Sequence, residues 1–130
     1  MKKFPEYNEH CWVILGQLIG ACWFGRLVYL TEGEPSEVEF NAEQILERDF
    51  RKRDVIGFVH THPNTQALPS DTDQGTMHAW VTALGKPLVC GIHGNDGLKS
   101  FVYADDESNA VQGRIFRVGR FVWGVNTIGG

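Results

Sequence analysis

The segment Asp54–His60 (DVIGFVH) is short and almost entirely apolar. A run of this length is expected for a strand that is buried in a sheet and covered on both faces. Pro63 follows closely, and because proline has no backbone N–H to donate, strand pairing should end there. The chain must therefore build a sheet around this strand and supply helices to cover it.

Two further strands and a helix are predicted before this segment. Cys11–Leu18 and Ala21–Thr31 are rich in β-branched and aromatic residues and predict neighbouring strands of a hairpin. Turn residues follow at Glu32–Ser36. Asn41 resembles the N-cap of a short amphipathic helix. The inner face of this helix is expected to consist of Ile45, Leu46 and Phe50.

The elements after the apolar run complete the pattern. A second helix is expected to begin near Ser70 and to end at Gly85. Its inward positions are Met77, Trp80, Val81 and Leu84. Strands are then predicted at Leu88–Ile92, Ser100–Tyr103 and Arg114–Val125. Gly94-Asn95-Asp96-Gly97 reads as a turn between the first two, the third has a bulge at Gly119, and Asp105–Gln112 is ambiguous. We predict an α/β (α+β) fold, a single domain over residues 1–130 with a mixed, curved β-sheet flanked by helices.

Composition excludes several classes of protein. The 130 residues fit one compact domain, and 42% hydrophobic with 22% charged residues is an ordinary globular balance. A net charge of −4 gives no basic footprint for nucleic acid, and no polybasic stretch suggests a membrane surface. Arg51-Lys52-Arg53 lies where a helix should end, so we interpret it as a match to the helix dipole.

The cysteines and the N-terminal segment suggest a reducing compartment. Cys11, Cys22 and Cys90 are few, odd in number and far apart, which favours free, buried thiols over a disulfide framework. The apolar stretch Cys11–Phe24 is too short and too interrupted to span a bilayer, and no signal-peptide pattern precedes it. We expect a cytoplasmic protein.

A histidine pair at the end of the apolar run predicts a metal site. Side chains at positions i and i+2 of a strand point to the same face, so His60 and His62 can meet one metal ion. A catalytic zinc needs a third protein ligand and an open position for water, and Asp73 is the nearest carboxylate with a reason to point back. The stretch Ser70–Asp73 also fits a plain helix capping box, and the two roles are compatible. The other histidines, His10, His78 and His93, are scattered and are expected to be ordinary surface or core residues.

The same residues resemble a known family. His60-Thr61-His62, seven intervening residues, Ser70, two residues and Asp73 match the H-[ST]-H-x7-S-x2-D motif of the JAMM (JAB/MPN+) zinc metalloproteases. That family also carries a glutamate on an early strand, and the stretch from Glu9 to Gly16 is similar to its pattern, although Trp12 stands where glycine is usual. No second His/Cys cluster is present, so the resemblance is to a compact prokaryotic-type member with an MPN/JAB-like domain.

The resemblance implies a mechanism. One catalytic zinc ion would be held by His60, His62 and Asp73, and Glu9 would act as the general base and acid. The hydroxyl of Ser70 would stabilise the oxyanion on the scissile carbonyl.

The resemblance also implies a substrate class. We expect cleavage after the C-terminal Gly-Gly of a ubiquitin-like protein or its conjugates, with activating (E1-like) and conjugating (E2-like) proteins of the same bacterial pathway as further partners. The alternatives are processing of a ThiS-like sulfur-carrier adduct and a non-catalytic MPN scaffold. The chain itself ends in Gly129-Gly130, and a disordered end is the simpler interpretation of that tail.

Overall fold

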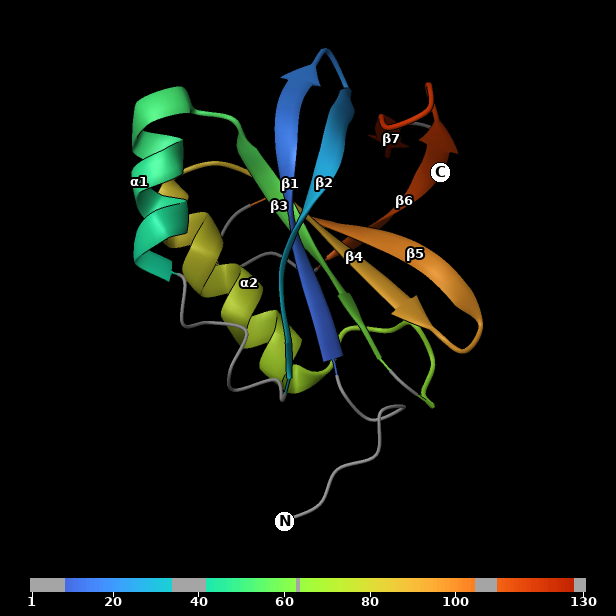
Figure 1. Ribbon diagram of the computed structural model, residues 1–130. Coiled ribbons are helices and arrows are strands. Elements are labelled where there is room, and N and C mark those ends of the chain that lie inside the picture. The colour runs from blue at the N-terminus through green and yellow to red at the C-terminus, as the bar shows by residue number, and fades with distance from the viewer. Residues whose placement is uncertain (1–8, 34–41, 63, 105–109, 128–130) are drawn as a thin grey trace.

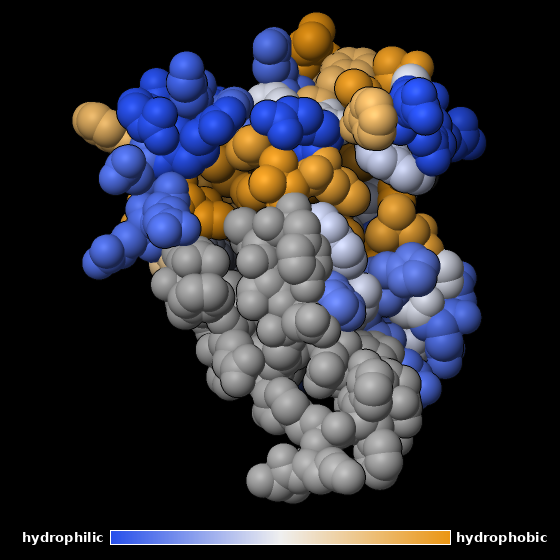
Figure 2. Space-filling view, in the orientation of Figure 1, coloured by the Kyte–Doolittle hydropathy of each residue, from blue (hydrophilic) through white to orange (hydrophobic). Residues whose placement is uncertain are grey.

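The computed structural model describes residues 9–33, 42–62, 64–104 and 110–127. In these ranges the elements follow the order β1 (Glu9–Ile19), β2 (Cys22–Gly33), α1 (Ala42–Lys52), β3 (Val55–Thr61), α2 (Asp71–Leu84), β4 (Leu88–Gly94), β5 (Gly97–Tyr103), β6 (Val111–Arg117) and β7 (Trp123–Asn126). Both helices lie on one side of the sheet (Figure 1), and in the same orientation hydrophilic side chains cover most of the surface at α1 (Figure 2). No helix in the described ranges is both long and apolar enough to cross a membrane.

The sheet closes on itself in the order β1-β2-β7-β6-β5-β4-β3, because β1 pairs with both β2 and β3. The β3–β4 pair is parallel and is connected through α2, whereas the other neighbouring pairs are antiparallel. This mixed sheet with two helices confirms the predicted fold class.

The strands are apolar on both faces because the closed sheet has two hydrophobic cores. The outer core packs strand residues such as Val13 and Val55 against Ile45 of α1 and against Met77 and Val81 of α2. The inner core lies within the closed sheet. It consists of Ile14, Trp23, Ile56, Val59, Val89, Val102 and Val125. Neighbouring positions alternate between the two cores, as the period of a strand requires.

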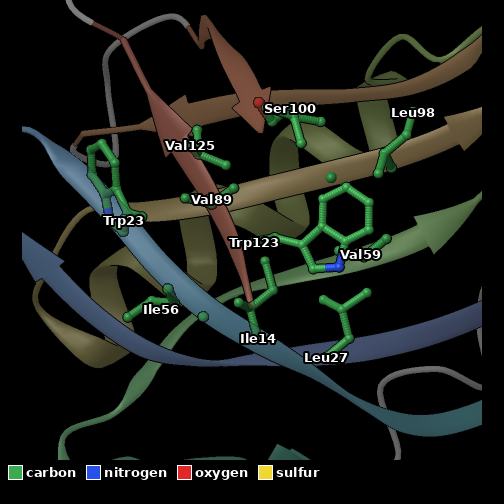
Figure 3. Close-up of a pocket in the computed structure, with 13 residues that line it drawn as sticks. Ile14, Trp23, Leu27, Ile56, Val59, Val89, Leu98, Ser100, Trp123 and Val125 are labelled. Atoms are coloured by element: carbon green, nitrogen blue, oxygen red, sulfur yellow. The ribbon is translucent and has the colours of Figure 1, made fainter. Parts of the chain in front are cut away.

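The inner core leaves a small cavity of about 40 Å³, shown in Figure 3. Its lining is apolar except for Ser100, whose buried hydroxyl has no hydrogen-bond partner among the described residues. Trp123 and Leu27 lie at one side of the cavity (Figure 3). This volume exceeds the roughly 10–15 Å³ that a cavity needs to hold one water molecule.

Most of the predicted elements are confirmed. The hairpin is β1–β2, and its turn lies at residues 20–21. The helix expected near Ser70 is α2, with Gly85 in the left-handed conformation as its C-cap and Met77, Val81 and Leu84 buried. The turn predicted at 94–97 joins β4 to β5. Arg51 and Lys52 lie in the last turn of α1, as the dipole argument requires.

The inner face predicted for α1 is wrong in part. Ile45 is buried, but Leu46 is partly exposed and the Phe50 side chain is 79% exposed. Asp49, one turn after Ile45, is buried in their place and is 2% exposed. Its carboxylate accepts hydrogen bonds from Lys86 Nζ (2.6 Å) and from the Val55 backbone N–H (3.1 Å), which supply the polar partners that burial requires.

The single final strand predicted at residues 114–125 is also wrong, because the chain turns back within it. β6 ends at Arg117 and β7 begins at Trp123, and the two pair antiparallel. The Val118 N–H donates to the Val122 carbonyl (2.9 Å) and closes the loop between them. Gly119 therefore lies in a reversal and not in a bulge.

Four predictions fall wholly or partly on residues outside the described ranges. Glu32 and Gly33 of the predicted turn belong to β2, whereas residues 34–36, the Asn41 cap, most of 105–112 and the Gly129-Gly130 tail lie outside the described residues. The three cysteines, all of them in the described ranges, form no disulfide; Cys11 and Cys90 are buried as expected, and Cys22 is half-buried. Burial raises the pKa of the Cys90 thiol, which keeps it protonated and unreactive.

Candidate metal centre

β3 brings His60 and His62 to one face of the sheet. This strand is held on both sides, since His60 is the register partner of Cys11 in β1 and of Ile92 in β4. Thr61 points the other way, and its hydroxyl accepts a hydrogen bond from the His10 backbone N–H of β1 (2.9 Å). The strand geometry inferred from the His-x-His spacing is therefore present.

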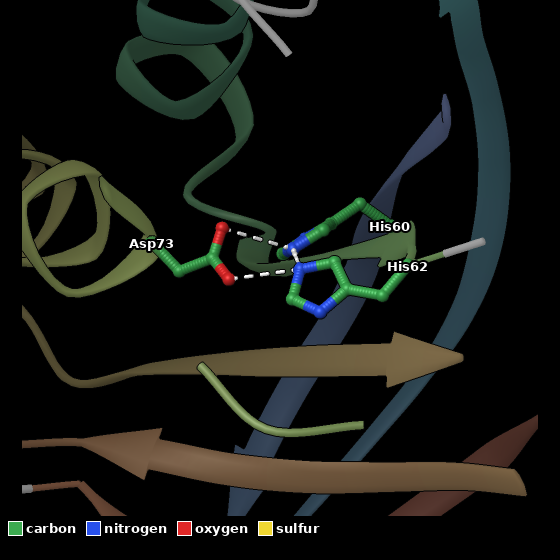
Figure 4. A group of neighbouring side chains, drawn as sticks. All are labelled: His60, His62 and Asp73. Atoms are coloured by element: carbon green, nitrogen blue, oxygen red, sulfur yellow. Dashed lines mark hydrogen bonds and ion pairs between the residues drawn. The ribbon is translucent and has the colours of Figure 1, made fainter. Parts of the chain in front are cut away.

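Asp73 reaches the same point from the first turn of α2. The Ser70 hydroxyl accepts a hydrogen bond from the Asp73 backbone N–H (3.1 Å), and the Ser70 N–H donates to Asp73 Oδ2 (2.9 Å). This is a complete capping box. The Asp73 carboxylate also faces both histidines, so the capping role and the role in the cluster coexist in one side chain (Figure 4).

The three side chains converge through their potential ligand atoms. His60 Nε2 lies 3.1 Å from Asp73 Oδ1, His62 Nε2 lies 3.0 Å from Asp73 Oδ2, and the two Nε2 atoms are 3.0 Å apart. Ligand atoms held by one tetrahedral zinc at about 2.0–2.1 Å lie roughly 3.3 Å from one another, so the donor set fits such an ion. Among the described residues, His60, His62 and Asp73 form a group that could hold a metal.

The protonation of His62 also suits a metal ligand. Its Nδ1 lies 3.4 Å from the Gln66 carbonyl oxygen, which can only accept a hydrogen bond. Donation from Nδ1 to that carbonyl would leave the lone pair of Nε2 for a cation, in place of the contact that Nε2 makes with Asp73 Oδ2. A backbone carbonyl that accepts from the second ring nitrogen is a common means of orienting a metal-ligating imidazole.

The electrostatics of the cluster favour an ionised carboxylate. Burial of Asp73 by itself would raise its pKa. Hydrogen bonds from His60 and His62, the charge of His60 and the Ser70 N–H act in the opposite direction and hold the pKa of Asp73 well below its ordinary value. The site therefore presents an anionic oxygen and two imidazoles to a cation.

The loop between His62 and α2 is fastened to the β4–β5 turn. The His62 N–H donates to the His93 carbonyl (2.9 Å), the Asn95 N–H to the Thr65 carbonyl (2.8 Å), and the Ala67 N–H to Asp96 Oδ1 (2.8 Å). Gly94 allows the close approach, because a Cβ there would lie 2.5 Å from the Ala67 nitrogen.

The family model Prok-JAB, described as prokaryotic homologs of the JAB domain, matches residues 7–112. The chain belongs to this family. The match spans most of this chain and includes His60, His62 and Asp73. It confirms the family resemblance seen in the sequence. A search of curated proteins finds no match.

The remaining predicted site residues of this Prok-JAB domain lie at the same end of the sheet. Ser70 is exposed at the N-cap of α2, next to the cluster. Glu9 begins β1, but its side chain is not among the described ones. Their catalytic roles stay predictions.

The other histidines are not part of the metal-capable group found in the described ranges. The His93 side chain is exposed, and the His78 ring packs edge-on against Tyr103 at 5.5 Å. The sequence analysis interpreted the segment Gly94–Gly97 only as a turn, and it did not predict that Gly94 and Asp96 support the loop of the metal site. A possible signal in the sequence was Asp96, a carboxylate in the turn: it accepts the hydrogen bond from the Ala67 N–H, next to the point where Gly94 contacts the loop between His62 and α2.

Proposed function

We propose that this Prok-JAB domain is a zinc-dependent isopeptidase or peptidase that cleaves after the C-terminal Gly-Gly of a ubiquitin-like protein. The observation that carries the proposal is the convergence of three side chains: His60 Nε2 and His62 Nε2 lie 3.0 Å apart, and each lies within 3.1 Å of one carboxylate oxygen of Asp73. Three protein ligands of the N/O type are what a catalytic zinc site uses.

Zinc at this site would lower the pKa of a bound water to about 7 and would polarise the scissile carbonyl. The ligands are held in place before binding, since Asp73 is fixed by the capping box and His62 by the Gln66 carbonyl. A supported first shell keeps its geometry when a cation and a substrate arrive.

We assign Glu9 the proton transfers. It would take a proton from the attacking water and pass it to the leaving amine. The register of the sheet supports this role: Cys11 pairs with His60 in an antiparallel pair, so Glu9, two residues earlier in β1, belongs to the end of the sheet where β3 ends, next to His62.

We assign Ser70 the stabilisation of the oxyanion. Its oxygen already accepts the hydrogen bond from the Asp73 N–H, so the hydroxyl proton remains available to donate. Because Ser70 is exposed and next to the metal ligands, a carbonyl oxygen of the substrate can reach it.

The substrate class rests on the family resemblance. An extended Gly-Gly tail suits a narrow cleft that any larger side chain would block. Conjugates of a ubiquitin-like protein, and the E1-like and E2-like proteins that make them, are the partners that we propose.

Metal content tests the site directly. Protein purified without chelator should hold about one zinc per chain by elemental analysis. The His60→Ala/His62→Ala double variant should hold none, whereas His93→Ala, a matched change at an exposed side chain, should keep its zinc. Full zinc in the double variant would contradict the assignment.

Activity tests the reaction. The substrates are a ubiquitin-like protein joined through Gly-Gly to a reporter, once by a peptide bond and once by an isopeptide bond to lysine, and an Ala-Ala version as the control. Mass spectrometry should find cleavage after the second glycine, lost in His62→Ala. Release of a small adduct from a ThiS-like carrier, with both protein bonds intact, would favour the sulfur-carrier alternative. Zinc bound without any hydrolysis would favour the scaffold.

A further inference from the structure

A basic surface pocket lies on the side of the sheet away from the helices. It has a volume of about 470 Å³ and is formed by β2, the end of β6, the loop 118–122 and the start of β7. Its described lining consists of Arg26, Leu27, Arg117, Arg120, Phe121 and Trp123. We refer to these six residues as the arginine pocket. Figure 1 places β6 and β7 on the far side of the sheet from α2, which carries Asp73.

The charged side chains that line the arginine pocket are all positive. Three of its six described residues are arginines and none is acidic. Arg26 makes neither an ion pair nor a hydrogen bond with another described residue. The whole chain carries a net charge of −4, so the pocket is a local positive region on an acidic protein.

The pocket also contains two aromatic side chains, Phe121 and Trp123. The Arg117 guanidinium stacks on the Trp123 ring at 4.8 Å and donates to the Arg120 carbonyl (2.8 Å), which fixes the loop that presents Arg120. Phe121 projects beside it with 71% of its surface exposed. Arginine and aromatic side chains are the residues that protein interfaces use most as anchors.

The backbone beside the pocket offers an edge for strand addition. β7 pairs with β2 from Cys22 to Gly25, and the pocket begins at the next residue, Arg26. In the described part of the chain no other strand than β1 pairs with β2 after this point. An extended peptide can use such an edge for main-chain hydrogen bonds.

We infer that the arginine pocket is the docking surface for a short, extended, acidic segment of a partner protein that carries an apolar side chain. The carboxylates would meet Arg26 and Arg120, and the apolar side chain would pack on Phe121. The pocket suits a short protein segment better than a nucleic acid, because a long polyanion would extend over a surface whose net charge is negative. This inference goes beyond the proposed hydrolysis and does not depend on it, because docking involves neither the metal nor Ser70.

Fluorescence anisotropy with a labelled peptide, acetyl-Glu-Asp-Leu-Glu-Asp-Leu-amide, tests the docking. The wild-type protein should bind it, and binding should weaken as salt is added. The Arg26→Gln/Arg120→Gln variant should bind at least about tenfold more weakly, the combined effect of two exposed ion pairs. Phe121→Ala should also weaken binding. Arg117 is left unchanged because it holds the loop.

The matched control removes the same charge elsewhere. Arg51→Gln/Lys52→Gln lies at the end of α1 and should bind the peptide as the wild type does. If this control lost as much affinity as Arg26→Gln/Arg120→Gln, the net charge of the protein alone would explain the binding. If the wild type bound the neutral peptide acetyl-Gln-Asn-Leu-Gln-Asn-Leu-amide as tightly as the acidic one, charge would play no part. Either result overturns the inference, as does the absence of binding to the wild type. Tighter binding of a single-stranded oligonucleotide of the same charge would assign the pocket to nucleic acid instead.

Discussion

At the scale of single residues, Asp73 is the centre of the site. One carboxylate closes the capping box of α2 and faces the two imidazoles at the end of β3, those of His60 and His62. Its rotamer is therefore set by the helix start before any cation arrives. The ordering of this side chain is part of folding and does not have to be repeated when a ligand binds.

Glu9 is the residue whose role most needs a direct test. Glu9→Gln keeps the size and the hydrogen bonding of the side chain but cannot accept a proton. The turnover number kcat on a Gly-Gly fusion should fall by about 10²–10⁴-fold, the usual share of acid–base catalysis, while zinc content and folding are retained. KM should change little, because Glu9 acts on water and not on the tail of the substrate.

The matched control for this test is Glu43→Gln, an exposed glutamate in the first turn of α1. It should leave kcat unchanged. Turnover close to that of the wild type in Glu9→Gln, with zinc bound, would mean that another group is the base.

At the scale of elements, a buried ion pair fixes how α1 lies on the sheet. Asp49 is 2% exposed and binds both Lys86, which follows α2, and the first backbone N–H of β3. The helix therefore turns Asp49 inward, and Leu46 and Phe50 are displaced toward solvent. These two polar contacts and the burial of Ile45 together set which face of α1 meets the sheet.

We expect Lys86→Met to destabilise the fold. The change leaves the Asp49 carboxylate buried without its cation, which should lower the free energy of unfolding by about 2–3 kcal/mol. Glu47→Gln, which breaks the exposed Glu47–Arg51 pair (3.9 Å), should change it by less than about 0.5 kcal/mol. Urea unfolding followed by circular dichroism measures both. Equal, small effects would show that the buried pair does not hold α1.

The sequence predicted the elements that are determined by local features, namely side-chain periodicity and helix caps. The His60 and His62 geometry follows from the two-residue repeat of a strand, and α2 follows from its capping box and from Gly85. The rotation of α1 could not be predicted, because Lys86 is distant in sequence and Asp49 looks like an ordinary surface residue. The β6–β7 reversal was missed because apolar residues continue through the exposed loop, in which Phe121 is 71% exposed.

At the scale of the whole molecule, the site depends on contact between segments that are far apart in the chain. A Cβ on Gly94 would lie 2.5 Å from the Ala67 nitrogen and 2.7 Å from the Thr65 oxygen, both of them backbone atoms that cannot rotate away. Gly94→Ala should therefore shift the loop that holds His62 and should weaken zinc binding by about 10–100-fold, the usual effect of disturbing the support of a metal ligand.

Gly75→Ala is the matched control. A Cβ on this exposed position of α2 meets nothing within 4 Å, so the change should stabilise the helix by up to about 1 kcal/mol and leave zinc affinity unchanged. Competition with a chromophoric chelator measures the affinity, and thermal unfolding measures the stability. Wild-type affinity in Gly94→Ala would show that the loop tolerates the displacement.

The closure of the sheet has a consequence for how the protein is made. Cys22 of β2, an early strand, pairs with Asn126 of β7, the last described strand. During translation β2 leaves the ribosome long before its partner exists, and the β1–β2 hairpin must wait with one side of β2 unpaired. Contacts of such large sequence separation form late and slowly. We therefore expect the nascent chain to expose the unpaired edge of β2, which is prone to aggregation, until β7 has been synthesised. We also expect the folding of this small domain to depend on ribosome-associated chaperones more than its size suggests.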